Sequence, residues 1–176
     1  YNCLEGLKDK GIVLINSIFS ADEIDKVLPN AYKKILQDKK AKLYVINAQK
    51  IAEKAGLGNK INIIIQTALF KVTNIIDFET AYKEIQKYVQ LTYGKKGQKI
   101  VNKNLSAMEL AKDKIEEVNI SKFTFKDEKP NAKNFDDKFY QTIMKKIERL
   151  EGDSIPVSAF DKSGKVPQGT ADFEKR

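Results

Sequence analysis

Two short, uninterrupted apolar runs constrain the fold of this chain more than any other feature. Residues 11–15 and residues 43–46 are rich in β-branched side chains, and the polar residues Asn16 and Asn47 end them. Such runs are typical of strands that are covered on both faces, as in a parallel sheet. Two helical patterns lie between them, one from residue 24 that stops near Pro29 and one over residues 31–36. Together with the helix after the second run, the order strand, helices, strand, helix predicts an open α/β sheet.

Capping signals bound two of the predicted helices. Ser20 and Glu23 have the spacing of a capping box, in which each residue satisfies a backbone N–H group at a helix start. Asn47 is placed to cap a helix over residues 48–55, and Gly56 stands where a left-handed helix terminator is expected. These signals predict helices directly after each of the two strands.

The stretch after Gly56 is predicted to be mainly helical. Residues 60–76 are strongly apolar, and their length favours a mostly buried helix because strands rarely reach ten residues. A helix over residues 98–114 and a short last strand over residues 116–120 come further on. Between them, Asp77 should cap a helix that turns five side chains inward: Ala81, Ile85, Tyr88, Val89 and Tyr93.

The composition changes toward the C-terminus. Residues 126–134 are polar, contain Pro130 and predict a linker, while residues 136–150 have a helical period. The remaining tail has glycines and prolines without a helical period, which favours an extended arm. We therefore expect an incomplete, open, mostly parallel α/β sheet with flanking helices, followed by a connector. The expected parts are residues 1–120, a linker and helix over residues 121–149, and an extended connector over residues 150–176.

Missing residue types exclude several kinds of chemistry. The chain has 176 residues, no histidine and one cysteine, Cys3, so it cannot build a Ser-His-Asp triad, a disulfide framework or a cysteine-based metal site. No carboxylate, lysine or tyrosine marks a catalytic centre. We therefore predict no catalytic residue and no metal ligand within this chain.

Charge and hydropathy bear on the partners of the chain. The net charge of +8 would suit a polyanion, but lysines alternate with acidic residues, as over residues 112–114, which is typical of solvated helix faces. No apolar run approaches the roughly 20 residues of a membrane-spanning helix, and no signal peptide is recognisable. We expect neither nucleic acid nor membrane as partner. The first residue, Tyr1, suggests a segment of a longer protein.

A short glycine turn is the candidate binding site. Gly58, Asn59 and Lys60 precede the predicted helix over residues 60–76, where backbone N–H groups and a lysine could meet a phosphate. Each residue also has a purely structural explanation. Gly58 would serve the turn, Asn59 would cap the helix, and Lys60 would be a solvated charge.

Several colinear segments resemble the third, or gamma, domain of pyruvate:ferredoxin (flavodoxin) oxidoreductases. The tail resembles the connector that leads toward the ferredoxin-like domain of that family. Residues 121–149 carry little of the resemblance. The matching segments are residues 10–17, 43–48, 56–62, 66–71, 93–97 and 102–107, and in the tail residues 150–160, 169–170 and 174–176.

The resemblance implies an activity for the whole enzyme. The family decarboxylates pyruvate on thiamine diphosphate, passes electrons through [4Fe-4S] clusters to ferredoxin or flavodoxin, and transfers the acetyl group to coenzyme A. Members are cytoplasmic enzymes of anaerobic metabolism and usually homodimers. The gamma domain is associated with coenzyme A binding and domain packing, which implies a coenzyme A contact at Gly58, Asn59 and Lys60.

The departures from the family pattern limit what this chain can do. It has no thiamine-diphosphate motif, no run of cluster-binding cysteines, and no glycine-rich loop of the kind that opens the gamma domain. We therefore expect an internal segment that holds no cofactor, is inactive alone, and has other domains of the same polypeptide as partners. Two alternatives remain open: a free-standing gamma subunit of a 2-oxoacid oxidoreductase, and a basic module that binds a polyanion.

Overall fold

The computed structural model describes residues 3–125 and 137–165. Contacts divide the chain into two compact units. One comprises residues 6–126, and the other comprises residues 1–5 together with residues 127–176.

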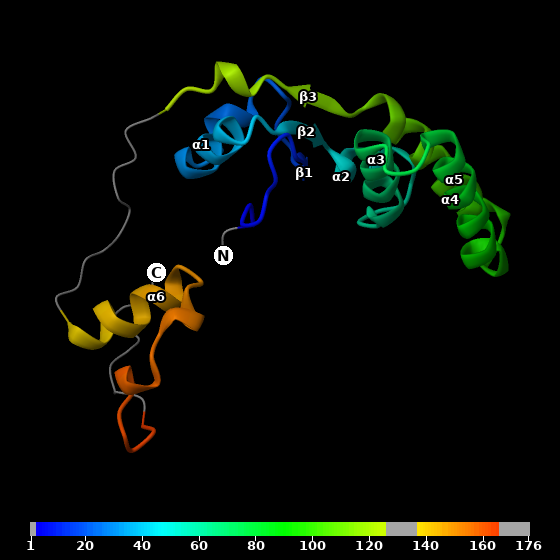
Figure 1. Ribbon diagram of the computed structural model, residues 1–176. Coiled ribbons are helices and arrows are strands. Elements are labelled where there is room, and N and C mark those ends of the chain that lie inside the picture. The colour runs from blue at the N-terminus through cyan, green and yellow to red at the C-terminus, as the bar shows by residue number, and fades with distance from the viewer. Residues whose placement is uncertain (1–2, 126–136, 166–176) are drawn as a thin grey trace. The chain divides into compact units, whose positions relative to one another are not determined.

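A three-stranded sheet lies at the centre of the unit formed by residues 6–126. Strand β1 (Ile12–Asn16) pairs in parallel with β2 (Lys42–Ile46), and β3 (Glu116–Val118) pairs with β2 in the antiparallel direction. The order β1-β2-β3 places β2 in the middle, as Figure 1 shows. The predicted α/β class with an open sheet and flanking helices is thus confirmed, and the sheet is mixed, with one parallel and one antiparallel pairing.

The two predicted parallel strands differ in burial. In β2, Leu43, Val45 and Ile46 are 0–2% exposed, as expected for a covered central strand. In β1, the four residues before Asn16 are only half-buried. The expectation that β1 is covered on both faces was therefore wrong. β1 also lies at the end of the described sheet, so a neighbouring strand covers only one of its two edges.

The connection between β1 and β2 contains one short and one regular helix. The capping box is confirmed in part, because the Ser20 N–H donates to the Glu23 carboxylate over 3.2 Å, while the Ser20 hydroxyl donates to the same carboxylate. The helix after this box is only the 3-10 turn η1 (Ile24–Lys26), since Pro29 disfavours helical geometry in the residue before it. Helix α1 (Asn30–Asp38) then leads to β2.

Four α-helices lie between β2 and β3 and confirm the predicted order. Asn47 caps α2 (Ala48–Lys54) by accepting from the Lys50 N–H over 2.9 Å, and Gly56 has the predicted left-handed conformation, with φ of +70°. Asp77 caps its helix in the same manner through the Thr80 N–H, over 3.0 Å. The remaining helices are α3 (Asn62–Thr73), α4 (Phe78–Tyr93) and α5 (Gln98–Asp113).

Small side chains let three helices approach closely beside the sheet. Ile64 of α3 is fully buried against a layer of α2 and α5, where alanines predominate. A second apolar cluster joins α3, α4 and α5. The buried members of the first cluster are Ile46, Ala48, Ile51, Ala52, Ile64, Ala68, Ala107 and Ala111, and those of the second are Ile63, Tyr82, Ile85, Val89, Val101 and Met108.

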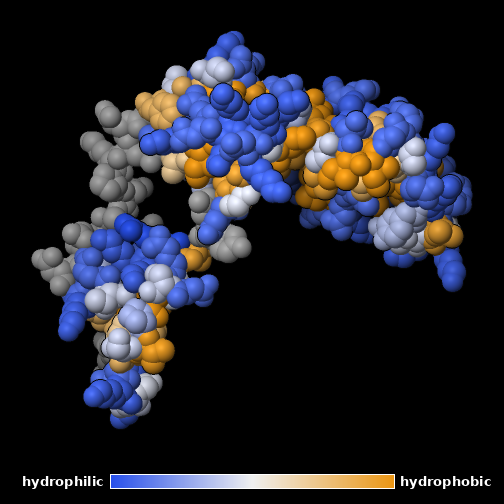
Figure 2. All heavy atoms as spheres, viewed as in Figure 1, coloured by the Kyte–Doolittle hydropathy of each residue, from blue (hydrophilic) through white to orange (hydrophobic). Residues whose placement is uncertain are grey.

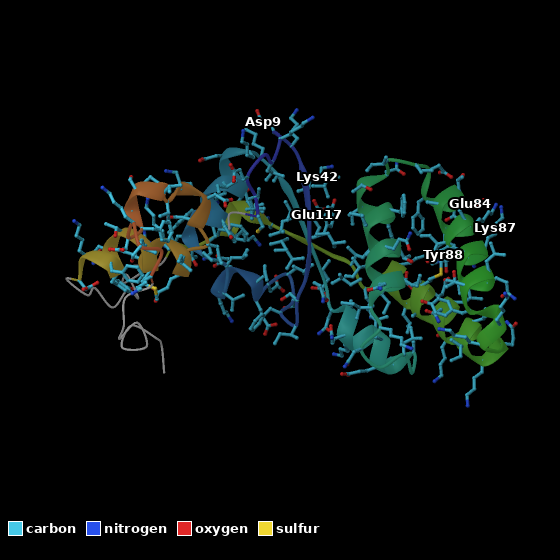
Figure 3. The ribbon with its side chains drawn as sticks, turned by 90° about the horizontal axis from the view of Figure 1, so that it is seen from below. Asp9, Lys42, Glu84, Lys87, Tyr88 and Glu117 are labelled. Carbon is cyan, nitrogen blue, oxygen red and sulfur yellow. The ribbon has the colours of Figure 1, made fainter. Side chains whose placement is uncertain are left out.

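The prediction for Tyr88 was wrong. Its side chain is 53% exposed, and in Figure 3 it lies on α4 near Glu84 and Lys87, which form an exposed ion pair of 2.6 Å. Tyr82 takes the inward place instead, because the buried stripe of α4 runs through Tyr82 and Ile85 rather than through Tyr88.

A buried lysine fastens the segment that leaves β3. Lys33 of α1 is 1% exposed, and its ammonium group donates to the Thr124 carbonyl over 2.7 Å and pairs with Asp25 over 2.8 Å. Asp25 also accepts from the backbone N–H and the hydroxyl of Thr124, over 3.1 and 2.6 Å. Gln37 adds a bond of 2.7 Å to the Ile120 carbonyl, within the turn η3 (Ile120–Lys122).

These contacts lower the pKa of the Asp25 carboxyl, chiefly through the Lys33 ammonium and then through Thr124. We name the set Lys33, Asp25 and Thr124 the exit clamp. It fixes where the polypeptide leaves the unit formed by residues 6–126.

The described part of the second unit is residues 3–5 and 137–165. The predicted helix over residues 136–150 is present in its described part, where a π-helical turn continues into a short α-helix and Ile143 is buried. Ile147, one turn further along this segment, is 49% exposed. The predicted linker over residues 126–134 and the end of the connector lie outside the described residues. The elements are η4 (Tyr140–Met144), α6 (Lys145–Glu148), η5 (Gly152–Ser154) and η6 (Val157–Ala159).

Candidate functional site

A cavity of about 360 Å³ opens where the parallel strands β1 and β2 end. In open α/β sheets, ligands bind in the crevice outside the carboxyl ends of the strands, so the location is informative. The sheet and the helices both contribute to it, through the end of β2, the loop after β1, helix α2 and the end of α5. The lining residues are Ile18, Phe19, Ser20, Glu23, Val45, Ile46, Asn47, Lys50, Ile51, Lys54, Leu110, Lys114 and Glu116. We call this cavity the strand-edge pocket.

Backbone hydrogen bonds fix the loop that forms one wall of the strand-edge pocket. The Ser17 N–H donates to the Ile46 carbonyl over 2.9 Å and extends the pairing of β1 with β2. The Phe19 N–H donates to the Ser17 hydroxyl over 3.0 Å. Further along, the Ala21 N–H donates to the Glu116 carboxylate over 2.9 Å, which joins the loop to β3. The wall is therefore held by both β2 and β3.

Three exposed lysines line the strand-edge pocket. Lys50 and Lys54 lie one turn apart on α2, and Lys114 directly succeeds the last residue of α5. Within the described residues, none of their ammonium groups forms a hydrogen bond or an ion pair, whereas both carboxylates of the pocket accept backbone N–H groups. The Ser20 backbone and hydroxyl lower the pKa of Glu23, so this carboxylate is ionised at neutral pH.

The turn predicted as a binding site lies elsewhere, between α2 and α3. Gly58 has a φ of +59°, which explains the glycine as a turn residue, and open space surrounds the position of a side chain there. Asn59 is exposed and does not cap the next helix, whose cap residue is Ile61. The turn therefore presents its polar groups to solvent.

Of the predicted set, Lys60 lines a cavity in the described part of the chain. This cavity measures about 80 Å³, and Lys60 shares it with two further lysines, Lys96 and Lys103. The Lys103 ammonium donates to the Gly56 carbonyl over 2.8 Å, and the Lys96 ammonium lies 5.7 Å from the Tyr93 ring centroid. The turn is thus the centre of a basic cluster, which we call the turn cluster: Lys60, Lys96 and Lys103.

The strand-edge pocket was not predicted from the sequence. One available signal was the position of Asn16 and Asn47, because polar residues that end two adjacent parallel strands meet at the same edge of the sheet. The two asparagines do act there, since Asn16 accepts from the Ala48 N–H over 3.0 Å and Asn47 caps α2. The ends of the strands could not have identified Lys114, because it follows α5, and the packing of α5 on the other helices brings it to this edge of the sheet.

No group of three or more potential metal-ligating side chains occurs among residues 3–125 and 137–165. A search of the same residues finds no helix that is both long and apolar enough to cross a membrane.

An α/β unit with a pocket at the edge of its parallel strands is a common scaffold for ligand-binding domains of enzymes. Comparison with known proteins specifies the family. The family described as "Pyruvate ferredoxin/flavodoxin oxidoreductase" matches residues 1–114, and a domain of unknown function matches residues 125–176. The chain belongs to the pyruvate ferredoxin/flavodoxin oxidoreductase family.

The curated relatives are much longer than this chain. Pyruvate:ferredoxin oxidoreductase of Moorella thermoacetica is 43% identical over 100% of this chain and 15% of its own length. The probable pyruvate-flavodoxin oxidoreductase of Escherichia coli is 37% identical over the same shares. A solved structure, pyruvate oxidoreductase subunit PORC of Thermotoga maritima, is 19% identical, with a TM-score of 0.49 over 66% of this chain and 57% of that one. This chain spans about 15% of the length of the curated relatives it matches.

Proposed function

We propose that this chain is a segment of a larger cytoplasmic, homodimeric enzyme of anaerobic metabolism. That enzyme decarboxylates pyruvate oxidatively to acetyl-CoA and passes the electrons to ferredoxin or flavodoxin. The observation that carries the proposal is the 43% identity to a pyruvate:ferredoxin oxidoreductase over the whole chain, at 15% of that relative's length. The partners of the segment are then the other domains of the same polypeptide.

The cofactors of the whole enzyme do not fit this segment. A [4Fe-4S] cluster takes four cysteine ligands, and the chain has only Cys3. The thiamine-diphosphate motif is likewise missing from the sequence. Thiamine diphosphate and the clusters are therefore assigned to other domains, and no catalytic step is assigned to residues of this chain.

Coenzyme A does fit the turn cluster. Its ADP part carries several phosphates, and phosphates favour lysines and free backbone N–H groups. Gly58 and Asn59 leave the backbone of the turn open to solvent, and Lys60, Lys96 and Lys103 supply positive charge around the adjoining cavity. We assign these residues a supporting contact to the phosphates of coenzyme A.

A role in domain packing is supported by exposed apolar side chains. Apolar atoms gather on the surface over α3 in Figure 2, and Leu69, Ile75 and Ile76 at the end of this helix are 45–79% exposed. In the second unit, Leu150 and Val157 are 70% and 88% exposed. Such surfaces on a soluble domain mark contacts with other protein surfaces.

The size and activity of the native polypeptide test the segment proposal. An antibody against this chain should detect a band well above 100 kDa in a lysate of the source cells, since the chain spans 15% of its relatives. The isolated chain should show no pyruvate-dependent reduction of a viologen dye. A band near 20 kDa would instead indicate a free-standing subunit or a polyanion-binding module.

Replacing lysines of the turn cluster tests the coenzyme A contact. In the full-length enzyme, the double variant Lys60→Gln/Lys96→Gln should raise the KM for coenzyme A about tenfold, because charge-assisted bonds to phosphate are lost. The KM for pyruvate should stay unchanged. Steady-state kinetics with each substrate varied in turn would measure both.

The matched control for this experiment is Lys83→Gln. Lys83 is an exposed lysine of α4 that lines neither cavity. This variant should leave both KM values as they are. An unchanged KM for coenzyme A in the double variant would remove the turn cluster from the coenzyme A site.

A further inference from the structure

We propose that the strand-edge pocket is a binding site for a small organic anion, a carboxylate or phosphate that carries a short apolar group. The pocket shares no lining residue with the turn cluster. The inference rests on the pocket itself and does not depend on the proposed role in coenzyme A binding.

The charges of the pocket favour an anion. Within the described residues, Lys50, Lys54 and Lys114 have no partner, while Glu23 and Glu116 each accept a backbone N–H of the loop after β1. The acidic groups are therefore directed to the wall of the pocket, and the basic groups remain available to a ligand. An anion that enters would form charge-assisted hydrogen bonds with groups that have no competing partner.

The apolar lining specifies the other end of the ligand. Ile51 and Ile46 are buried beneath the pocket, and Leu110 is half-buried beside them. Ile18 and Phe19 at the opening are 75% and 38% exposed. These side chains would lose contact with water when an apolar group covers them, which favours binding. A volume of about 360 Å³ is near the lower end for ligand pockets and suits a small molecule.

The site is also formed in advance. The loop that carries Ile18 and Phe19 is fastened to β2 and β3, and Asn47 fixes the first turn of α2, which carries Lys50. Binding therefore requires little ordering of the backbone, and this lowers its entropic cost.

Four probe molecules test the proposal on the full 176-residue chain. Phenyl phosphate and phenylacetate combine an anion with an apolar ring, inorganic phosphate has only the charge, and benzyl alcohol has only the ring. In NMR titrations, at least one of the two aromatic anions should shift the amide signals of Ile18, Phe19 and Lys50. Affinity should fall with added salt. Failure of both aromatic anions to bind would overturn the proposal, as would equal affinity for benzyl alcohol or for inorganic phosphate.

Charge-matched variants locate the binding. Lys50→Gln/Lys114→Gln should weaken the aromatic anion about tenfold or more, since bonds to charged groups are lost. The control Lys83→Gln/Lys99→Gln removes the same charge from exposed positions of α4 and α5 outside the pocket. It should retain the affinity of the wild type. Equal weakening in both double variants would show a general effect of net charge and would overturn the site.

Discussion

Replacing Lys33 by methionine should lower the free energy of unfolding by about 2–3 kcal/mol, because it removes charge-assisted hydrogen bonds from a buried position and leaves Asp25 without its cation. The ammonium group of Lys33 joins Asp25 to the Thr124 carbonyl, and the lysine side chain is 1% exposed. Methionine keeps the volume of the stem but none of the bonds. Urea denaturation of the chain, followed by circular dichroism, measures the loss.

The neighbouring residue provides the control for this experiment. Lys34 lies on the exposed side of α1, so Lys34→Met should change stability by less than about 0.5 kcal/mol. Equal losses in the two variants would contradict a specific role for the exit clamp and would indicate a general effect of charge on α1.

The exit clamp also makes the free energy of unfolding depend on pH in the acidic range. The Lys33 ammonium and Thr124 lower the pKa of Asp25 in the folded chain. Their contribution to the free energy of unfolding is therefore complete above the pKa of an unfolded aspartate, about 3.9. It is lost as the pH falls through the lower pKa of the folded chain. Lys33→Met should flatten this acid limb of the stability curve. An identical limb in the variant and the wild type would show that other carboxylates cause it.

The sequence predicts this fold well where local signals and burial agree. The runs at residues 11–15 and 43–46 form adjacent parallel strands, and Asn47, Gly56 and Asp77 bound helices as expected. Each of these features depends on a few neighbouring residues, whose preferences do not need the rest of the chain. The apolar segment from residue 60 was assigned correctly as a helix by its length, although the helix ends at Thr73 and the predicted residues Ile75 and Ile76 are exposed.

The errors occur where distant residues decide the outcome. The half-burial of β1 results from its position in the sheet, and Tyr88 is exposed because α4 meets α3 and α5 along Tyr82 and Ile85. The exit clamp was also unpredictable, since Lys33 and Thr124 are 91 residues apart in the chain. A lysine in a helical pattern predicts a solvated charge, and only the returning segment after β3 makes this one buried.

The same limit applies to the candidate sites. Gly58, Asn59 and Lys60 were recognisable because they are contiguous, whereas the strand-edge pocket combines residues from the loop after β1, from α2 and from the end of α5. Its lysines have no distinctive sequence context among the 32 basic residues of the chain. Their distinguishing property is spatial. Within the described part of the chain their ammonium groups have no hydrogen-bond or ion-pair partner, although they line the same pocket as two carboxylates, which accept backbone N–H groups.

Replacing Ile64 by alanine should lower the free energy of unfolding by about 3 kcal/mol, because it removes a fully buried side chain from a closely packed layer and leaves a cavity there. Ile64 is 0% exposed and lies in the first apolar cluster, where most neighbours are alanines. Such short side chains cannot extend to fill the space. Thermal and urea denaturation of the variant beside the wild type would measure the loss.

The control is the same substitution at Ile75, which is 79% exposed just after α3, and it should cost less than about 0.5 kcal/mol. The cluster around Ile64 also joins β2 to α2, which carries Lys50 and Lys54, and to α5, which Lys114 directly follows. We therefore expect Ile64→Ala to weaken phenyl phosphate binding at the strand-edge pocket even where the chain remains folded, because the lysines lose their fixed spacing. Unchanged binding together with the full loss of stability would show that the pocket is held by its loop and caps rather than by this core.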